Sequence, residues 1–402
     1  MPSLSPQQQQ ALKQLVTDSF VRPRTTKQGV AGHAADASTT AADPLLQDLD
    51  CYVVGGAVRD ALLGLPAGDK DWVVVGSSPE IMAAKGFIPV GGDFPVFLHP
   101  HTKEEFALAR TERKSGRGYK GFTFYTGTDV SLADDLKRRD LTINAMAIDR
   151  QGQLHDPLQA YKDLQQKVLR HIGNAFIEDP VRLLRLARFA ARFTQFRVAD
   201  TTMHLAEQLV HNGEVDALVP ERVWQELHRG LASADPVRMF DVLHQCGALK
   251  RIMPHLVYSA AVRQLLQAAL IHPLTTKQRF ALLCVQSPHV AQLAQQLKAP
   301  AAYQDLAQLV PWFIHQLDTV HTAQAMAACL QRVDVLRRPE RFTELLQVVQ
   351  QVVEVDEAQW QRAAQSYRSV DAGAIAAQYA QQPQHIPAAI QQARVAAVSA
   401  SF

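Results

Sequence analysis

Two aspartates separated by one residue, Asp69 and Asp71, stand at the start of a short apolar, β-branched stretch that continues to Val75. Such residues favour a strand, and side chains alternate across a strand, so we expect both carboxylates to project from the same face. Mg²⁺ is usually held by one or two carboxylates together with substrate phosphates. The pair therefore predicts a Mg²⁺ site in which Asp69 and Asp71 are both metal ligands and catalytic residues.

A glycine pair precedes this candidate metal site. Gly55-Gly56 follows the strand-like residues 52–54 and precedes a segment, 57–63, with helical apolar spacing. Gly56 lets the backbone approach a triphosphate closely, and Arg59 can donate a fork of hydrogen bonds to it. A glycine pair alone is usually a turn, and Asp-x-Asp alone is more often a solvated strand end. Their order within one small α/β unit indicates a metal-dependent nucleotidyl-transfer site.

Three basic segments follow along the chain. Residues 110–122 mix basic residues and glycines with Tyr119 and Phe122, a pattern that suits phosphate contact and base stacking but also describes a solvated loop. Residues 136–147 carry paired arginines before an apolar run. Residues 178–193 predict an amphipathic helix, which alone would be read as a surface helix with a solvated basic face. Its polar face holds Asp179, Arg182, Arg185, Arg188 and Arg192, and its apolar face Leu183, Leu186, Ala190 and Phe193.

The motif GGAVRD at residues 55–60, followed by DKD at 69–71, resembles the signature of the DNA polymerase β-type nucleotidyltransferase superfamily. More narrowly, the chain is similar to the class II tRNA nucleotidyltransferases, the CCA-adding enzymes, and to their relatives the bacterial poly(A) polymerases. The resemblance covers roughly residues 51–250. It implies template-independent addition of CCA to the 3′ end of tRNA from CTP and ATP, with two Mg²⁺ ions at Asp69 and Asp71 and release of pyrophosphate.

The resemblance also implies roles for the basic segments. In the RRDxxxNA motif, Arg139 would contact the nucleotide phosphate or ribose, and Asp140 and Asn144 would order the sugar site. In the EDxxR motif, Asp179 and Arg182 would read the Watson–Crick edge of CTP or ATP. A carboxylate accepts from an exocyclic amino group and a guanidinium donates to a ring nitrogen or carbonyl. The remaining implied residues are Arg185 and Arg188 for the triphosphate, Glu105 as a third metal carboxylate, and Glu221, Arg222 and Glu226 as a structural charge network.

Two departures from related enzymes qualify the resemblance. Ala160 stands where the family's DPxxGxxDL hinge has glycine, which affects local backbone freedom. Val285-Gln286 stands where a His-Asp phosphohydrolase domain would place its metal-binding pair, so we predict that such a domain is lost or shortened. The alternatives are a poly(A) polymerase, which would favour a strongly basic C-terminal tail, and a non-catalytic RNA-binding relative, which intact motifs argue against.

Bulk composition is compatible with this interpretation. The 402 residues suggest two or more domains, and 41 Lys and Arg against 39 Asp and Glu neither demand nor exclude nucleic acid. The four cysteines include no CxxC pair, which favours reduced thiols. No apolar run approaches the ~18 residues needed to span a bilayer. We therefore expect a soluble, cytoplasmic protein, a monomer or weak homodimer, with no membrane partner.

The elements that position these motifs divide the chain. We predict an N-terminal extension, residues 1–50, that is mostly disordered apart from one helix over 5–20. We expect an α/β nucleotidyltransferase head with a mixed, polymerase β-like sheet over 51–172, with strands at 52–54, 72–75, 96–98, 105–109 and 144–148. An all-α region follows: a neck over 173–235 with the base-reading motif and a body and tail over 236–402 for tRNA binding.

Overall fold

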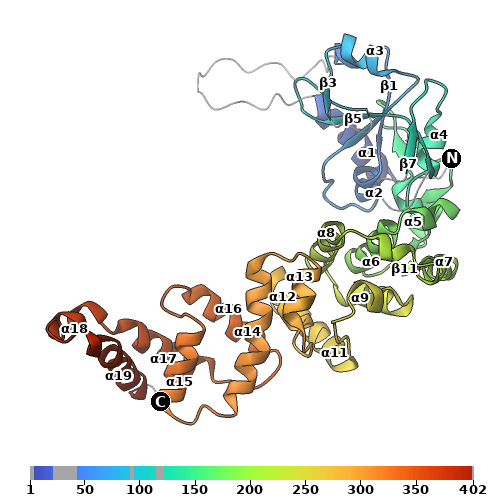
Figure 1. Ribbon diagram of the computed structural model, residues 1–402. Helices are drawn as coiled ribbons and strands as arrows, with labels where there is room; N and C mark the ends of the chain where they lie inside the picture. The colour runs from blue at the N-terminus through green and yellow to red at the C-terminus, as the bar shows by residue number, and fades with distance from the viewer. Residues whose placement is uncertain (1–3, 21–42, 91–94, 115–121, 401–402) are drawn as a thin grey trace, which may run out of the picture. The chain divides into compact units, whose positions relative to one another are not determined.

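The computed structural model describes residues 4–20, 43–90, 95–114 and 122–400. The chain divides into two compact units, residues 1–218 and 219–402 (Figure 1). The first unit contains a mixed sheet and short helices, and the second is helical throughout its described residues. The predicted fold class, an α/β head followed by an all-α region, is confirmed.

The first unit is built on a seven-stranded sheet with the order β3-β4-β5-β2-β1-β8-β9. Its strands are β1 (Asp50–Val54), β2 (Asp71–Val75), β3 (Ile88–Val90), β4 (Val96–Leu98), β5 (Glu105–Leu108), β8 (Ala147–Ile148) and β9 (Leu154–His155). β2 pairs antiparallel with β1 and parallel with β5. The register places Asp71 opposite Val54 on one side and Glu105 on the other. The glycine pair therefore begins directly after the residue that faces Asp71.

Apolar residues on these strands explain why the sheet forms. Trp72, Val73 and Val74 are all buried, so β2 is covered on both faces. The Trp72 ring stacks on Phe106 of β5 with centroids 5.1 Å apart. Val73 belongs to a core cluster with Leu136 of α4 (Leu132–Lys137). The central strand is thus held rigidly from Trp72 onward, while Asp71 at its first position is exposed.

Short helices and a hairpin surround the sheet. They comprise α2 (Gly56–Leu62), α3 (Pro79–Ala84), the hairpin of β6 (Thr111–Lys114) and β7 (Phe122–Tyr125), α4, the 3₁₀ turn η2 (Thr142–Asn144) and α5 (Ala160–Gln165). After them come β10 (Val168–Leu169), η3 (Asn174–Glu178), α6 (Val181–Arg192), β11 (Arg197–Val198), α7 (Asp200–His211) and η4 (Glu214–Ala217). β10 and β11 pair in parallel, and α6 lies between them in the sequence. This pairing connects both ends of the segment that contains the arginine-rich helix.

The N-terminal helix is part of the first unit's core. α1 (Pro6–Phe20) is the helix expected over residues 5–20, and Leu12 in it is fully buried. Gln8 Nε2 donates to the Leu62 carbonyl at the end of α2 (2.9 Å), and Tyr161 Oη of α5 donates to Gln8 Oε1 (2.9 Å). The turn η1 (Pro44–Leu46) leads into β1, which begins at Asp50. The rest of the extension, residues 21–42, lies outside the described residues.

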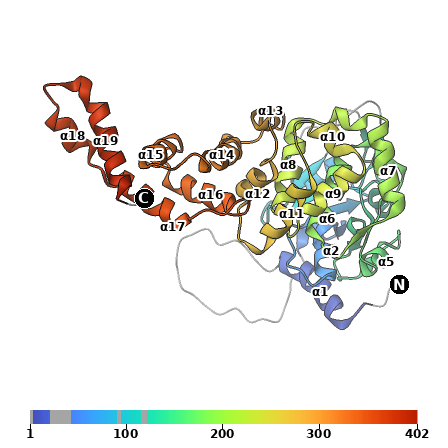
Figure 2. The ribbon, with the colours of Figure 1, turned by 90° about the horizontal axis from the view of Figure 1, so that it is seen from below.

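The second unit is a succession of short helices (Figure 2). They are α8 (Pro220–Leu231), α9 (Val237–Gln245), α10 (Ala248–Ile252), α11 (Ala260–Ala268), η5 (Ala269–Ile271), α12 (Thr276–Leu283), α13 (Val290–Gln296), α14 (Ala301–Leu317), α15 (Ala323–Arg332), α16 (Pro339–Val349), α17 (Glu357–Ser369), α18 (Ala372–Gln378), η6 (Pro383–His385) and α19 (Ile386–Ser399). Helix α14 packs against both α12 and α16. Of the helices in the described ranges, none has the length and apolar content to cross a membrane.

Aromatic clusters hold this helical unit together. Trp224 of α8 packs edge-on against Phe280 of α12 (5.4 Å between centroids) and Tyr303 of α14 (5.0 Å). Phe313 and Trp360 form a second contact, 4.8 Å between centroids. Aromatic pairs at these separations add to the free energy of burial. On α8, Glu221 pairs with Lys298, and Glu226 Oε1 lies 3.5 Å from Arg229 Nη1. The charge network expected among Glu221, Arg222 and Glu226 stays a prediction.

Candidate active site

The glycine turn and Asp71 meet at the same end of the central strands β1 and β2. Asp69 lies in a bend before β2, so the expectation that both aspartates belong to one strand is wrong for Asp69. Gly55 has a φ of +74°, and a Cβ there would lie 3.0 Å from Arg139 Nη1. Glycine is needed at this position for both reasons, because other residues rarely adopt such a φ and the arginine leaves no room. Arg139 therefore lies against the turn that follows β1, next to the strand that begins with Asp71.

The predicted charged residues act on one another here. Desolvation raises the pKa of Asp71, Arg139 lowers it, the negative charge of Asp69 raises it and Arg185 lowers it. The strand register gives the geometry: Asp71 pairs with Val54, the residue before the glycine turn against which Arg139 lies. Burial is the largest cause of the raised pKa of Asp71, and the negative charge of Asp69 adds to it, so a cation beside the two carboxylates would stabilise their ionised forms.

The two carboxylates fit a divalent metal. Asp69 and Asp71 are both exposed and offer hard oxygen donors, the type that Mg²⁺ prefers. Glu105 is in register with Asp71 on the neighbouring parallel strand, so their side chains share a face, and it too is exposed. Among the described residues, however, no three His, Cys, Asp or Glu side chains converge on one point. The described residues thus provide two carboxylates, with Glu105 in register with one of them.

Arg59 is buried below the glycine turn. Its side chain is 3% exposed, and its guanidinium donates to Asp60 Oδ1 (2.9 Å from Nε) and to Asn144 Oδ1. It also lies over the rings of Phe189 (5.2 Å to the centroid) and Phe193 (4.9 Å). Desolvation lowers its pKa to about 10, against the opposing effect of Asp60. The fork expected from Arg59 to a triphosphate is therefore directed to protein partners in this structure.

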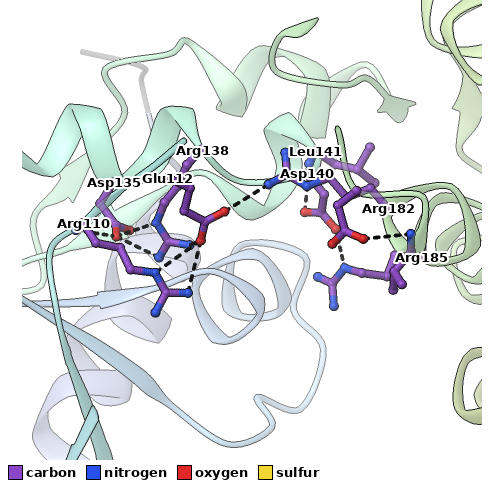
Figure 3. A network of polar contacts seen from close by, with 10 residues as sticks. Arg110, Glu112, Asp135, Arg138, Asp140, Leu141, Arg182 and Arg185 are labelled. Carbon is purple, nitrogen blue, oxygen red and sulfur yellow. Dashed lines mark hydrogen bonds and ion pairs between the residues drawn. The ribbon is translucent and has the colours of Figure 1, made fainter. Parts of the chain in front are cut away.

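Asp140 connects the RRD motif to helix α6 (Figure 3). Its Oδ1 accepts from the Leu141 backbone N–H (2.8 Å) and from Asn144 Nδ2 (3.0 Å), and its Oδ2 accepts from Arg185 Nε (2.6 Å). Burial alone would raise the pKa of Asp140, but Arg185 and these hydrogen bonds together lower it to about 2. Because Asn144 also accepts from Arg59, one chain of polar contacts joins the glycine-turn helix to α6.

A second contact fastens α6 to the same helix. Arg192 Nη2 donates to Asp60 Oδ2 (2.8 Å), and Asp60 also holds Arg59. The two ends of α6 are therefore tied to α2, through Asp140 and Asn144 at one end and through Asp60 at the other. This arrangement sets the position of the arginine-rich helix relative to the metal site.

Arg139 is a partly buried cation with one buried N–H. Its Nη2 donates to Asp135 Oδ2 (3.2 Å), and Asp135 is fully buried with a lowered pKa, because the positive charges of Arg139 and Arg138 outweigh desolvation. Its Nε is buried and has no hydrogen-bond partner. A buried N–H without an acceptor is costly and is often satisfied by a ligand. The arrangement fits the expected role of Arg139 at a phosphate or ribose.

The EDxxR motif lies at the start of helix α6. Asp179 precedes the N-cap residue Pro180, and its Oδ1 accepts from the Val181 N–H (3.0 Å). Arg182 is 8% exposed, and its Nη2 lies 3.5 Å from Glu112 Oε2. Arg185 binds Asp140, and Arg188 lies over the Phe189 ring (4.3 Å). The polar face of α6 is thus engaged by the head and is not a solvated basic surface.

The predicted apolar face of α6 is confirmed by burial. Leu183, Leu186 and Ala190 are fully buried, and Phe193 is 6% exposed. The apolar face of α6 therefore packs in the core, and Arg182 and Arg185 on its polar face form ion pairs.

Three acidic residues of the site were not singled out in the sequence: Asp60, Glu112 and Asp135. Asp135 precedes Arg139 by four positions on a helical segment, a spacing that brings side chains together and could have revealed the pair. Glu112 lies on β6 in a segment in which only the basic residues and aromatic residues were considered. Residues 115–121 of that segment lie outside the described residues.

Comparison with known families agrees with this geometry. A family model described as "Poly A polymerase head domain" matches residues 51–170, which hold the glycine turn and both aspartates. A second, described as "Probable RNA and SrmB- binding site of polymerase A", matches residues 195–259.

Curated relatives match most of the chain. The "CCA-adding enzyme" of Bordetella bronchiseptica is 56% identical over 356 residues, which cover 89% of this chain and 98% of the relative. The "Multifunctional CCA protein" of an Azoarcus species is 48% identical, with coverage of 87% of this chain and 96% of the relative.

Solved structures share the fold. A structure described as "The complex structure of CCA-adding enzyme with CTP" has a TM-score of 0.67 at 19% identity, covering 88% of this chain and 86% of that one. The corresponding complex with ATP has a TM-score of 0.65 at 20% identity, with the same coverage. Given the catalytic-site motifs, the near-complete coverage by relatives and the shared architecture, this chain belongs to the class II CCA-adding enzymes.

Proposed function

We propose that the edge of the sheet around Asp69 and Asp71 is the centre at which this enzyme adds CCA, without a template, to the 3′ end of tRNA. Family membership supports the reaction, with CTP and ATP as the nucleotide substrates. The observation that supports the residue assignment is the position of Asp71 opposite Val54, directly before the glycine turn against which Arg139 lies. Carboxylates and an arginine beside the glycine turn would stabilise the charge of an activated hydroxyl and a triphosphate.

We assign the metal ligands to Asp69 and Asp71. The family implies a divalent cation, and the hard oxygen donors of this site favour Mg²⁺. Two such ions bound there would lower the pKa of the tRNA 3′-hydroxyl and would stabilise the negative charge of the leaving pyrophosphate. The chain itself positions the α-phosphate for attack and neutralises charge, and catalysis by positioning and electrostatics is sufficient for phosphoryl transfer.

We assign the triphosphate to the arginines around the glycine turn. Gly56 allows close approach of the backbone, Arg139 offers its unpartnered buried Nε, and Arg185 and Arg188 extend along α6. Arg59 supports these groups indirectly, since it holds Asn144, which in turn holds Asp140. This arrangement differs from the direct contact expected of Arg59, because its guanidinium is already committed to Asp60 and Asn144.

We assign base selection to Asp179 and Arg182 at the start of α6. Cytosine and adenine both carry an exocyclic amino group that a carboxylate can accept from, whereas uracil and guanine present groups of opposite polarity. Asp179 and Arg182 lie within one turn of each other, so a single base edge can meet both. Because the substrate is tRNA, we infer that the enzyme acts in the cytoplasm, as a monomer or weak homodimer.

The test is nucleotide addition to tRNA that lacks its 3′ CCA, with CTP and ATP supplied singly and together. Wild type should add two C residues with CTP alone and complete CCA with both nucleotides. Asp69→Ala and Asp71→Ala should lose addition but keep tRNA affinity, because the carboxylates act mainly in the transition state. Asp50→Ala is the matched control, since Asp50 is an exposed carboxylate at the opposite end of β1.

Two results would overturn these assignments. Addition above about a tenth of the wild-type rate in both aspartate variants would exclude Asp69 and Asp71 as the catalytic pair. A long A tail from ATP alone would identify a poly(A) polymerase instead of a CCA-adding enzyme.

A further inference from the structure

One carboxylate outside the motifs contacts arginines from three parts of the first unit (Figure 3). Glu112 Oε1 lies 3.2 Å from both Nε and Nη2 of Arg110, which precedes β6. The same oxygen accepts from Arg138 Nη1 at the end of α4 (2.9 Å). Glu112 Oε2 lies 3.5 Å from Arg182 Nη2 on α6. The two oxygens thus divide the contacts, one for the head and one for the base-reading helix.

Both side chains of the Glu112–Arg182 contact are largely buried. The Glu112 side chain is 13% exposed and that of Arg182 is 10% exposed, so water competes weakly for either. Desolvation lowers the pKa of Arg110 to about 10, with Glu112 among the groups that oppose the shift. Arg138 has a second carboxylate partner, Asp135, at 2.8 Å. Loss of the Glu112 charge would therefore leave Arg138 paired and change the environment of Arg182.

The contact with Glu112 involves one end of the Arg182 guanidinium. A guanidinium has five N–H donors in a rigid fork, and the contact at 3.5 Å uses only Nη2. An arginine side chain has many rotamers, and reading a base edge requires one of them. An anion that is itself held by other arginines selects one rotamer before the nucleotide arrives, which is preorganisation of the site.

We propose that Glu112 is a positioning residue for nucleotide selection: it holds the Arg182 guanidinium in the orientation that distinguishes cytosine and adenine from uracil and guanine. This inference rests on the proposed role of Arg182. The proposal gives Glu112 on β6 a function in nucleotide specificity, although this residue lies outside the sequence motifs.

The test measures a ratio, so that a general loss of activity cancels. For wild type and Glu112→Gln, kcat/KM is determined for CTP and UTP on tRNA lacking CCA, and for ATP and GTP on tRNA ending in CC. The Kd values of CTP and UTP are measured by calorimetry, which needs no turnover. The preference for CTP over UTP should fall roughly tenfold, within the discrimination that one base-reading hydrogen-bond pair provides. Glu112→Asp keeps the negative charge but moves it away from Arg182, so its preference for CTP over UTP should also fall. This variant provides the test if Glu112→Gln does not fold.

Two further variants separate positioning from bracing. Arg110→Gln removes another partner of Glu112 on the hairpin and should leave the nucleotide preference unchanged. In an Arg182→Ala background, Glu112→Gln should cause no additional loss of preference, because contacting residues that act through one another are non-additive. An equal loss of rate for all four nucleotides, or additive losses in the double variant, would overturn the positioning role.

The failure of the proposed function would look different. If Arg182→Ala itself leaves the preference for CTP over UTP intact, Arg182 does not read the base, and the assignment of α6 fails together with the inference. If Arg182→Ala changes the preference and neither Glu112 variant does, only the inference about Glu112 fails.

Discussion

Asp140 is the residue whose loss should most clearly show how the site is held together. It accepts hydrogen bonds from Leu141, Asn144 and Arg185, and it lies in the only chain of contacts described above that runs from Arg59 through Asn144 to α6. We consider Asp140→Asn, which keeps the shape of the side chain and removes its charge. The introduced amide can accept from Leu141 and Asn144 with its oxygen, but its NH₂ group then faces the Arg185 Nε–H, so two donors oppose each other.

The cost follows from the pKa. The ordinary value of 3.8 falls to about 2 in the folded protein, which corresponds to about 2 kcal/mol of stabilisation at about 1.4 kcal/mol per pKa unit. A depressed carboxylate pKa contributes stability that is fully present above the unfolded value and is lost as the pH falls through the folded value. The stability difference between wild type and Asp140→Asn should therefore be constant near neutral pH and shrink as the pH falls from 3.8 toward about 2.

The assay must report on the first unit alone, because a chain with two compact units need not unfold in one transition. Trp72 is the only tryptophan in residues 1–218. Labelling with 5-fluorotryptophan gives its ¹⁹F signal, and urea titration of that signal measures the free energy of unfolding of the unit that contains Asp140. Asp48→Asn is the matched control, because Asp48 is 83% exposed and its contact with Lys85 is 3.8 Å long. It should cost about 0.5 kcal/mol or less.

Two outcomes would refute the reasoning. A difference at pH 7 as small as that of the Asp48 control would mean that Asp140 is not held by charge. A difference at pH 7 that persists unchanged to pH 3 would mean that packing, and not the ionised carboxylate, accounts for the loss.

Three other changes test the remaining architecture. Gly55→Ala should reduce nucleotide addition at least tenfold without changing the circular dichroism of the protein. A non-glycine residue held at a φ of +74° costs about 1–3 kcal/mol, and the new Cβ would lie 3.0 Å from Arg139 Nη1. Full activity of this variant would show that the turn does not require glycine. Leu12→Ala should lower the unfolding free energy of the first unit by about 2–5 kcal/mol, measured on the Trp72 signal, because Leu12 is fully buried; a loss as small as that of an exposed substitution would show that α1 is dispensable. The full-length protein should not hydrolyse 2′,3′-cyclic nucleotides with Ni²⁺, Mn²⁺ or Mg²⁺, since Val285-Gln286 replaces the expected His-Asp pair; metal-dependent hydrolysis would contradict that prediction.

The sequence alone predicted the features that depend on local patterns. Alternation of side chains along residues 71–75 indicated a strand, and β2 spans Asp71–Val75. Helical spacing over 178–193 indicated the helix whose apolar face is buried as α6. The strands β3, β9, β10 and β11 were not predicted, because two or three residues carry too little pattern. β6 and β7 were not predicted because their segment was interpreted as a basic loop, and the strand expected over 144–148 is only β8 (Ala147–Ile148), after the turn η2. The boundaries of neck and body and the roles of the site residues stay predictions.

Only the tertiary structure decided which charges meet. Arg59 is paired with Asn144, 85 positions later in the chain, and Glu112 contacts Arg182, 70 positions later. No periodicity connects such residues, since their approach depends on how the sheet, α2 and α6 pack together. Sequence motifs identified the groups able to bind a metal and a nucleotide because residue type sets what an atom can donate or accept. Burial and partner then determined which of those groups remain available to a ligand, and these are properties of the folded chain.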